Sequence, residues 1–376
     1  MTIVFCIYDF ADDNLPLQPW LTIKMLAEGL TGRGHSVHIV TDAASPVRLD
    51  GVGLHVVTSF RGTNDAQLQR LLREIGPDIL VCLPTPLNIA TSNWLNCVAG
   101  CKVVGFASYP FYSRIELLRA WKQLSFRVIK EYLRHALIPG FIWKMAMRKK
   151  LDAVIAQSET TANRIRQMIG GGLRTYPIPA GIDLAHWPYC RKDVGRELRI
   201  LYLGAATAIR GFDLAVEAVS ISKIASLEFR ILARGADEEK VKFIKERVLH
   251  ITGGKKVSIV GGWIERKELI KEIHTADIVL QPFLLVPSEF PVTAMEVIAC
   301  GTPVIGSRID GLPSAIGPAG TVVTHGSSDA LAKAIDLFGA DASVRDAWKA
   351  GCKDQRDKML HWNQVVGQWE AVFAAL

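Results

Sequence analysis

Short apolar runs alternate with segments of helical periodicity along the whole chain. Brief runs rich in β-branched residues predict buried strands, and patterns with a period near 3.6 predict the helices between them. This alternation is typical of parallel sheets with helices on both faces. The strands predicted in the first half are residues 2–10, 36–41, 53–58, 78–83, 102–107 and 153–157. The helices predicted there are residues 21–30, 68–75 and 160–169, with a longer helical segment from residue 114 that breaks near 139.

The alternation is interrupted at residues 176–196, which contain Pro177, Pro179 and Pro188 and end in a polar run. Such a segment predicts a linker between domains. The pattern then resumes, with strands predicted at 198–203, 228–232, 257–260, 278–281, 303–307 and 321–324. The helices predicted in this half are residues 212–222, 238–249, 266–274, 294–300 and 328–338. We therefore expect an α/β protein with two Rossmann-like, doubly wound domains, residues 1–186 and 187–360, facing each other across a cleft.

The segment around residues 286–311 holds the strongest candidate for a binding site. A helix is predicted to begin near Val292, and a helix start offers unpaired N–H groups that suit a phosphate or a sugar hydroxyl. Glu296 lies one turn further, where its carboxylate can accept two hydroxyl groups of a ribose. A capped helix with a glutamate facing solvent explains the same residues equally well.

This segment resembles the signature of the family 4 retaining glycosyltransferases, which have the two-domain GT-B fold. Residues 296–305 read EVIACGTPVI, close to the family pattern Glu-Ala-Met-Ala-x-Gly-x-Pro-Val-Ile. Five further segments resemble family motifs in the same order along the chain: 33–37 (RGHSV), 152–159 (DAVIAQSE), 178–183 (IPAGID), 203–211 (LGAATAIRG) and Trp362. The resemblance implies that a last helix, residues 361–376, packs back on the first domain.

The resemblance also implies roles for individual residues. Glu296 holds the ribose of a nucleotide-sugar, and Arg210 stands where the family has a lysine that binds the diphosphate, so these two are the expected catalytic residues. A fixed cation suits a diphosphate that gains negative charge as it leaves. Trp263 is the expected stacking surface for the base. The further residues expected to contact the donor are Gly204, Gly262, Ile264, Phe290, Pro291, Val292 and Thr293.

Several positions depart from the family pattern. Ala205 stands where the family has an arginine; Arg234 could replace that cation, although a surface-loop arginine explains it as well. The family's first glutamate falls at Ser288, with Glu289 next to it, so either residue is a candidate for sugar contact. The Gly-Gly loop after the first strand is replaced by residues 9–19. A GT-B protein that binds a nucleotide-sugar or glycan without transferring it is therefore the alternative to an enzyme.

The net charge of +7 is concentrated in one segment. Residues 114–150 hold ten basic and two acidic residues, interleaved with aromatic ones. Basic helices with aromatic faces are typical of membrane-surface elements, and a solvated basic face is the alternative. No nucleic-acid-binding motif accompanies the segment, so no nucleic-acid partner is expected. The residues expected to meet the membrane or the acceptor are Arg114, Arg119, Lys122, Arg127, Lys130, Arg148, Lys149 and Lys150.

The expected function is that of a retaining, hexosyltransferase-type glycosyltransferase. It would move a sugar from a nucleotide-diphosphate-sugar to a membrane-associated glycolipid or lipid-linked glycan. The donor is a co-substrate, and no cofactor is expected. The seven cysteines lack zinc-site spacing, so no metal is expected either. Because the first ten residues lack a basic start, we expect no signal peptide and a cytoplasmic protein, peripheral at the inner membrane face.

Overall fold

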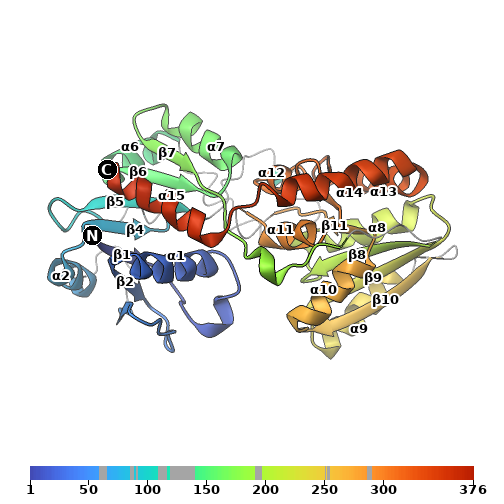
Figure 1. Cartoon of the computed structure of the whole chain (residues 1–376), viewed down its shortest axis with the longest axis horizontal. Coiled ribbons are helices and arrows are strands. Elements are labelled where there is room, and N and C mark those ends of the chain that lie inside the picture. The colour runs from blue at the N-terminus through green and yellow to red at the C-terminus, as the bar shows by residue number, and fades with distance from the viewer. Residues whose placement is uncertain are drawn as a thin grey trace.

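The computed structural model describes residues 1–58, 66–84, 89, 92–108, 117–118, 140–190, 197–249, 251, 255–285 and 290–376. Within them the chain forms two β-sheets in which every strand pairing is parallel. Helices pack against both sheets (Figure 1). The expected pair of doubly wound α/β domains is therefore confirmed, while the exact boundaries at 186/187 and 360/361 stay predictions.

The first sheet has seven strands in the order β3-β2-β1-β4-β5-β6-β7. They are β1 (Thr2–Cys6), β2 (Ser36–Thr41), β3 (Gly53–Val56), β4 (Ile79–Cys82), β5 (Lys102–Ala107), β6 (Ala153–Ala156) and β7 (Arg174–Pro177). The helices of this domain are α1 (Trp20–Gly32), α2 (Ala66–Ile75), α6 (Gly140–Lys150) and α7 (Glu159–Ile169). Because side chains alternate along a strand, Ile3 and Phe5 join the core under α1, while Val4 and Cys6 join a second cluster under α7.

The second sheet has six strands in the order β10-β9-β8-β11-β12-β13. They are β8 (Leu198–Gly204), β9 (Leu227–Arg234), β10 (Lys256–Gly262), β11 (Ile278–Gln281), β12 (Val304–Ser307) and β13 (Gly320–Val323). Its helices are α8 (Phe212–Ile221), α9 (Glu238–Val248), α10 (Arg266–Thr275), α11 (Val292–Ala299), α12 (Leu312–Ile316), α13 (Ser328–Ala340) and α14 (Ala342–Arg356). In both sheets the strand order reverses beside the central strand, which is where open parallel sheets bind ligands.

Two predicted boundaries were wrong, and two helices were missed. The first strand ends at Cys6 and not at residue 10, because Asp9 adopts a φ of 48° and turns the chain away from the sheet. The predicted linker starts too early, since Tyr176 and Pro177 pair with β6 at the end of an edge strand. A proline is tolerated there because an edge strand leaves its second side unpaired. The helices α12 and α14 were not predicted.

The chain crosses twice between the domains, and the two crossings touch. The backbone N–H of Ile182 on the first crossing donates to the carbonyl of Leu360 on the second, at 2.9 Å. Gly181 lies so close to Trp362 that a Cβ atom would come within 2.7 Å of the indole ring. After the second crossing, α15 (Trp362–Ala374) packs against α1, far from α13 and α14 (Figure 1). The crossings therefore join the two domains through a continuous apolar core.

Candidate functional site

A cavity of about 320 Å³ lies where the carboxyl ends of β8, β9 and β10 face the first domain. The last residues of these strands and the loops that follow them form much of its wall, together with the first turns of α11. One short segment of the first domain, residues 16–18, completes the wall. Every donor-site residue that was predicted from the sequence and that the structure describes lines this one cavity: Gly204, Arg210, Arg234, Gly262, Trp263, Ile264, Phe290, Pro291, Val292, Thr293 and Glu296. Ser288 and Glu289 lie outside the described residues.

Arg210 reaches the cavity from a tight turn after β8. The residue ends a short 3-10 helix (Ala208–Arg210), and Gly211 follows with a φ of 68°. A Cβ atom at Gly211 would lie 1.8 Å from the carbonyl oxygen of Pro282, so only glycine fits. The Arg210 guanidinium lies 5.7 Å from the centroid of the Phe283 ring. Burial lowers the pKa of Arg210; nearby Tyr202 opposes this shift and the positive charge of Arg234 adds to it.

Arg234 and Trp263 form a second feature of the wall. The guanidinium carbon of Arg234 lies 4.3 Å from the centroid of the Trp263 ring. Trp263 is 64% exposed, so the ring is covered on one side and open elsewhere. Ala205 also lines the cavity and brings no charge, whereas Arg210 and Arg234 bring two cations to it. The cavity therefore combines an aromatic surface with strong positive charge.

Glu296 lies on the second turn of α11 and supplies the acidic group of the cavity. Burial raises the pKa of its carboxyl to about 7, against the opposing effects of Arg234 and Arg266. The group is thus poised between its protonated and ionised forms near neutral pH. Perturbed carboxyls of this kind are concentrated at functional sites.

The first domain contributes Pro16, Leu17 and Gln18 to this cavity, and none of the three was predicted from the sequence. These residues follow the first strand, and a weak signal was present. The carboxyl ends of parallel strands face the ligand crevice, so the loop after β1 was a candidate by position alone.

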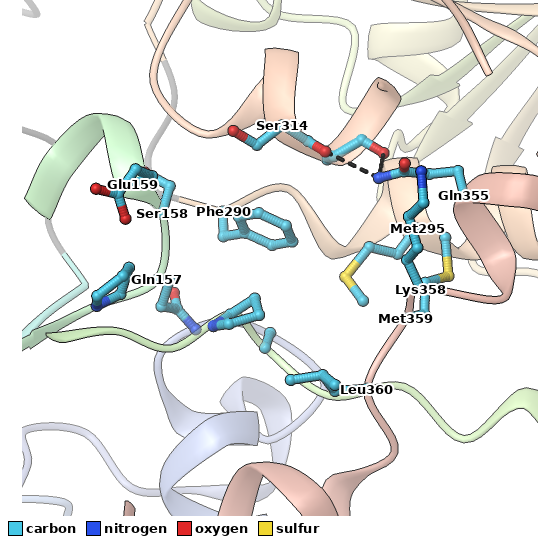
Figure 2. A pocket seen from close by; sticks show the side chains of 14 residues that line it. Gln157, Ser158, Glu159, Phe290, Met295, Ser314, Gln355, Lys358, Met359 and Leu360 are labelled. Atoms are coloured by element: carbon cyan, nitrogen blue, oxygen red, sulfur yellow. Dashed lines mark hydrogen bonds between the residues drawn. The ribbon is translucent and has the colours of Figure 1, made fainter. Parts of the chain in front are cut away.

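A second cavity, of about 260 Å³, lies beside the two crossings. Phe290 belongs to the walls of both cavities. Figure 2 shows its ring between Gln157 on the first domain and Met295 and Gln355 on the second. The amide of Gln355 donates to two backbone carbonyls of α12, at 2.9 and 3.1 Å. Because both crossings line this cavity, its shape depends on the relative orientation of the domains.

The structure describes only the end of the predicted basic surface. Arg114, Arg119, Lys122, Arg127 and Lys130 lie outside the described residues.

On α6, the exposed side chains include Phe141, Met145, Arg148 and Lys149, which share one face of the helix. Arg148 donates to the carbonyl of Gly170 at 2.7 Å, at the end of α7. Within the described part of the chain, each helix is too short or too polar to cross a bilayer.

Lys150 makes an internal contact of the same kind, since its ammonium group donates to the carbonyl of Ser92 at 2.5 Å. Two of the three basic residues at the end of α6, Arg148 and Lys150, therefore make hydrogen bonds within the first domain, in addition to any role at a surface.

Comparison with known proteins identifies a family for both halves of the chain. The family model for glycosyl transferases group 1 matches residues 192–355, and the model for glycosyltransferase family 4 matches residues 21–186. A glycogen synthase of Mycobacterium tuberculosis (strain CDC 1551 / Oshkosh) is 27% identical over 235 residues, covering 60% of this chain and 53% of that protein. A D-inositol 3-phosphate glycosyltransferase of Xylanimonas cellulosilytica is 25% identical over 243 residues, covering 59% and 57%. The chain thus matches about half the length of these curated relatives.

Solved structures resemble the chain over its whole length. A sucrose-phosphate synthase from Thermosynechococcus elongatus superimposes with a TM-score of 0.73 at 18% identity, covering 100% of both chains. The Anabaena protein HepE, in complex with UDP and glucose, superimposes with a TM-score of 0.70 at 15% identity, covering 100% of this chain and 99% of that one. The two family models and the shared architecture lead to one assignment: the chain belongs to glycosyltransferase family 4 and has the GT-B fold.

Proposed function

We propose that the protein is a retaining glycosyltransferase that moves a sugar from a nucleoside-diphosphate sugar to an acceptor held by the first domain. The observation that carries this proposal is the cavity at the carboxyl ends of β8, β9 and β10. It brings together two cations, an aromatic ring and a poised carboxyl within about 320 Å³. Each of these groups suits one part of such a donor.

Different groups of the cavity suit the diphosphate, the ribose and the base of the donor, which defines one orientation for it. Arg210 and the start of α11 suit the diphosphate, because cations and unpaired N–H groups both favour phosphate oxygens. Glu296 suits the ribose, whose two hydroxyl groups can donate to one carboxylate. The exposed ring of Trp263 suits the base, since every base offers a face for stacking. UDP is the nucleotide to test first, because HepE is described in complex with it.

The reaction follows from the charges in the cavity. The bond between the anomeric carbon and the diphosphate oxygen breaks, and negative charge grows on the departing diphosphate. Arg210 meets that charge with a fixed cation in a partly buried site, where electrostatic stabilisation is strongest. The acceptor hydroxyl attacks from the face that the diphosphate leaves and passes its proton to the departing diphosphate oxygen, so the configuration of the sugar is retained.

For the acceptor we propose a lipid-linked glycan or glycolipid at an anionic membrane surface. Phe141 and Met145 are 69% and 63% exposed on α6, beside Lys149. An apolar and basic helix face of this kind suits anionic lipid. A solvated basic face on a protein with a soluble acceptor is the competing hypothesis.

Two measurements test the proposed function. Thermal shift with UDP, ADP, GDP and their glucose conjugates identifies the donor, because a ligand that binds only the folded state raises the apparent stability. Transfer of radiolabelled sugar from the best donor to lipid extracts or soluble glycans then measures turnover. Binding without turnover on any acceptor would favour the rival hypothesis of a non-catalytic sugar-nucleotide-binding protein.

A further inference from the structure

Gln18 is the first-domain residue whose chemistry best complements the donor cavity. It lines the cavity together with Pro16 and Leu17, which are apolar. Its amide nitrogen is buried and has no hydrogen-bond partner among the described residues. A buried donor without a partner is costly, so such a group needs an explanation, and a missing ligand is one.

Three hydrogen bonds determine the orientation of the Gln18 amide. In the longest of them the amide nitrogen of Gln157 donates directly to the amide oxygen of Gln18, at 3.5 Å, and the other two form a chain through Thr22. The amide nitrogen of Gln157 donates to the hydroxyl oxygen of Thr22 at 3.2 Å. The Thr22 hydroxyl then donates to the amide oxygen of Gln18 at 2.6 Å. The Thr22 hydroxyl accepts from Gln157 through a lone pair and donates its single hydrogen to Gln18. Thr22 and Gln157 are both 1% exposed, so water does not compete for this chain.

The consequence is that the amide oxygen of Gln18 is engaged and its N–H groups remain for a ligand. An amide N–H only donates, and therefore requires an oxygen acceptor. Within the proposed donor these are the diphosphate oxygens and the hydroxyls of the sugar, because Glu296 and Trp263 suit the ribose and the base.

We infer that Gln18 donates a hydrogen bond to the diphosphate-sugar part of the donor, which makes it a donor contact supplied by the first domain. The inference rests on the proposed function and extends it. The other candidate donor contacts described above belong to the second domain or to the loop before α11. A bond from Gln18 therefore forms only when the two domains are close, so donor binding and domain approach are coupled.

The test compares the affinities of UDP and UDP-glucose by calorimetry for the wild type, Gln18→Ala and Gln18→Glu. Loss of one hydrogen bond to a charged oxygen should weaken binding about tenfold or more in Gln18→Ala. Gln18→Glu should weaken it further, because a carboxylate has no hydrogen to donate and repels the diphosphate. Gln368→Glu, an exposed position on α15, is the control for the added charge and should bind as the wild type does.

Comparing the affinities of UDP and UDP-glucose shows whether Gln18 donates to a diphosphate oxygen or to a sugar hydroxyl. An equal loss for UDP and UDP-glucose assigns the contact to the diphosphate, and a loss for UDP-glucose alone assigns it to the sugar. Wild-type affinities in both Gln18 variants overturn the contact while leaving the proposed function standing. If ADP or GDP is the donor nucleotide, the same comparison is made with it and its glucose conjugate. A wild-type protein that binds none of UDP, ADP, GDP and their glucose conjugates contradicts the proposed function itself.

Thr22 provides an independent test, because it acts as a positioning residue and touches no ligand. Thr22→Val removes the hydroxyl and with it the shorter of the two hydrogen bonds to the Gln18 amide oxygen. UDP-glucose affinity should therefore fall by several-fold, and Thr22→Ser should restore it. In the Gln18→Ala background, Thr22→Val should cause no further loss, since the group that it orients is already gone. Equal losses in both backgrounds would show a general structural effect and would overturn the chain Gln157–Thr22–Gln18 as the reason for the contact. Thermal melts without ligand show whether each variant is folded.

Discussion

The guanidinium group of Arg234 lies over the indole of Trp263, 4.3 Å from the ring centroid. A cation held against an aromatic face gains about 0.5–1 kcal/mol at exposed sites. The pair therefore stabilises the position of both side chains at the mouth of the cavity. Arg234 is the last residue of β9 and lines the cavity, so it is not the surface-loop arginine that the sequence left as an alternative, and it brings a cation to a site where Ala205 stands in place of the family's usual one.

We predict that Trp263→Ala weakens UDP binding about tenfold, because the base loses its stacking surface and Arg234 loses its support. Trp263→Phe should retain most of the affinity, since a smaller ring still offers a face. Calorimetry with UDP measures both. Equal affinity in the alanine variant and the wild type would mean that the base lies elsewhere in the cavity.

The sequence predicted the central strands better than the edges. The strands β2, β5 and β11 begin and end at the predicted residues, because they are short apolar runs bounded by polar residues or turns. The edge strand β7 has no buried residue and ends in proline, so its pattern resembles a loop. Helix α14 was missed because it has no apolar stripe: its buried residues are Lys349, Gly351 and Cys352.

In the site, the residues of local motifs were predicted from the sequence, and a residue that reaches the cavity from the other domain was not. Arg210 and Glu296 belong to local motifs, and such motifs can be read from neighbouring residues alone. Gln18 reaches the cavity only because the loop after β1 approaches the second domain, and its orientation depends on Gln157, which is distant in the sequence. Contacts between domains of this kind leave no local pattern.

The backbone turn at Gly211 should be essential for stability. We predict that Gly211→Ala lowers the melting temperature by about 5–10 °C, because the φ of 68° and the clash with the Pro282 carbonyl together cost several kcal/mol. Gly262→Ala is the control, since Gly262 also has a positive φ, of 89°, but has nothing within 4 Å of its Cβ position. Equal melting temperatures in the two variants would show that the turn relaxes around the added methyl group.

Arg210 should act mainly on the chemical step. We predict that Arg210→Ala lowers kcat about a hundredfold and raises the donor KM less, because the charge that Arg210 meets grows in the transition state. Arg210→Lys should retain much of the activity, as the family uses lysine at this position. Steady-state kinetics with the identified donor measure both constants. Normal turnover in the alanine variant would mean that another group holds the diphosphate, and Arg234 would be examined next.

Glu296 should make the ligand-free protein less stable as the pH rises. Its carboxyl has a pKa of about 7 in the folded protein, against the ordinary glutamate value of 4.5, so the folded state binds the proton more tightly than the unfolded state. Its contribution to stability is therefore full below about pH 4.5 and is lost progressively up to about pH 7. Glu296→Gln does not titrate. The melting temperature of this variant relative to the wild type should consequently be higher at pH 8 than at pH 5.

The variant Glu246→Gln, at an exposed position on α9, controls for the general effect of removing a carboxyl. Glu296→Gln should also bind UDP about tenfold more weakly than the wild type at pH 8, because a neutral amide is a poorer acceptor for the ribose hydroxyls than a carboxylate. A constant difference in melting temperature across the pH range would show that the Glu296 carboxyl is not protonated near neutral pH.

The exposed face of α6 should bind anionic membranes. Arg148 and Lys150 are poor sites for a test, since both donate to backbone carbonyls and their loss would disturb the packing of the helix. Phe141, Met145 and Lys149 are the better choice. Replacing all three with Gln should weaken co-sedimentation with anionic vesicles, because it removes two apolar contacts and a basic residue worth about 1 kcal/mol near such a surface.

Replacement of Leu337, an exposed residue on α13, with Gln is the matched control and should leave membrane binding unchanged. Binding by the wild type should decrease from low to moderate salt, because salt screens the attraction between basic residues and lipid. UDP affinity should be the same in the triple variant and the wild type, since the proposed donor cavity contains none of the three residues. Equal sedimentation of the wild type with neutral and anionic vesicles would contradict a membrane-bound acceptor and would favour a soluble one.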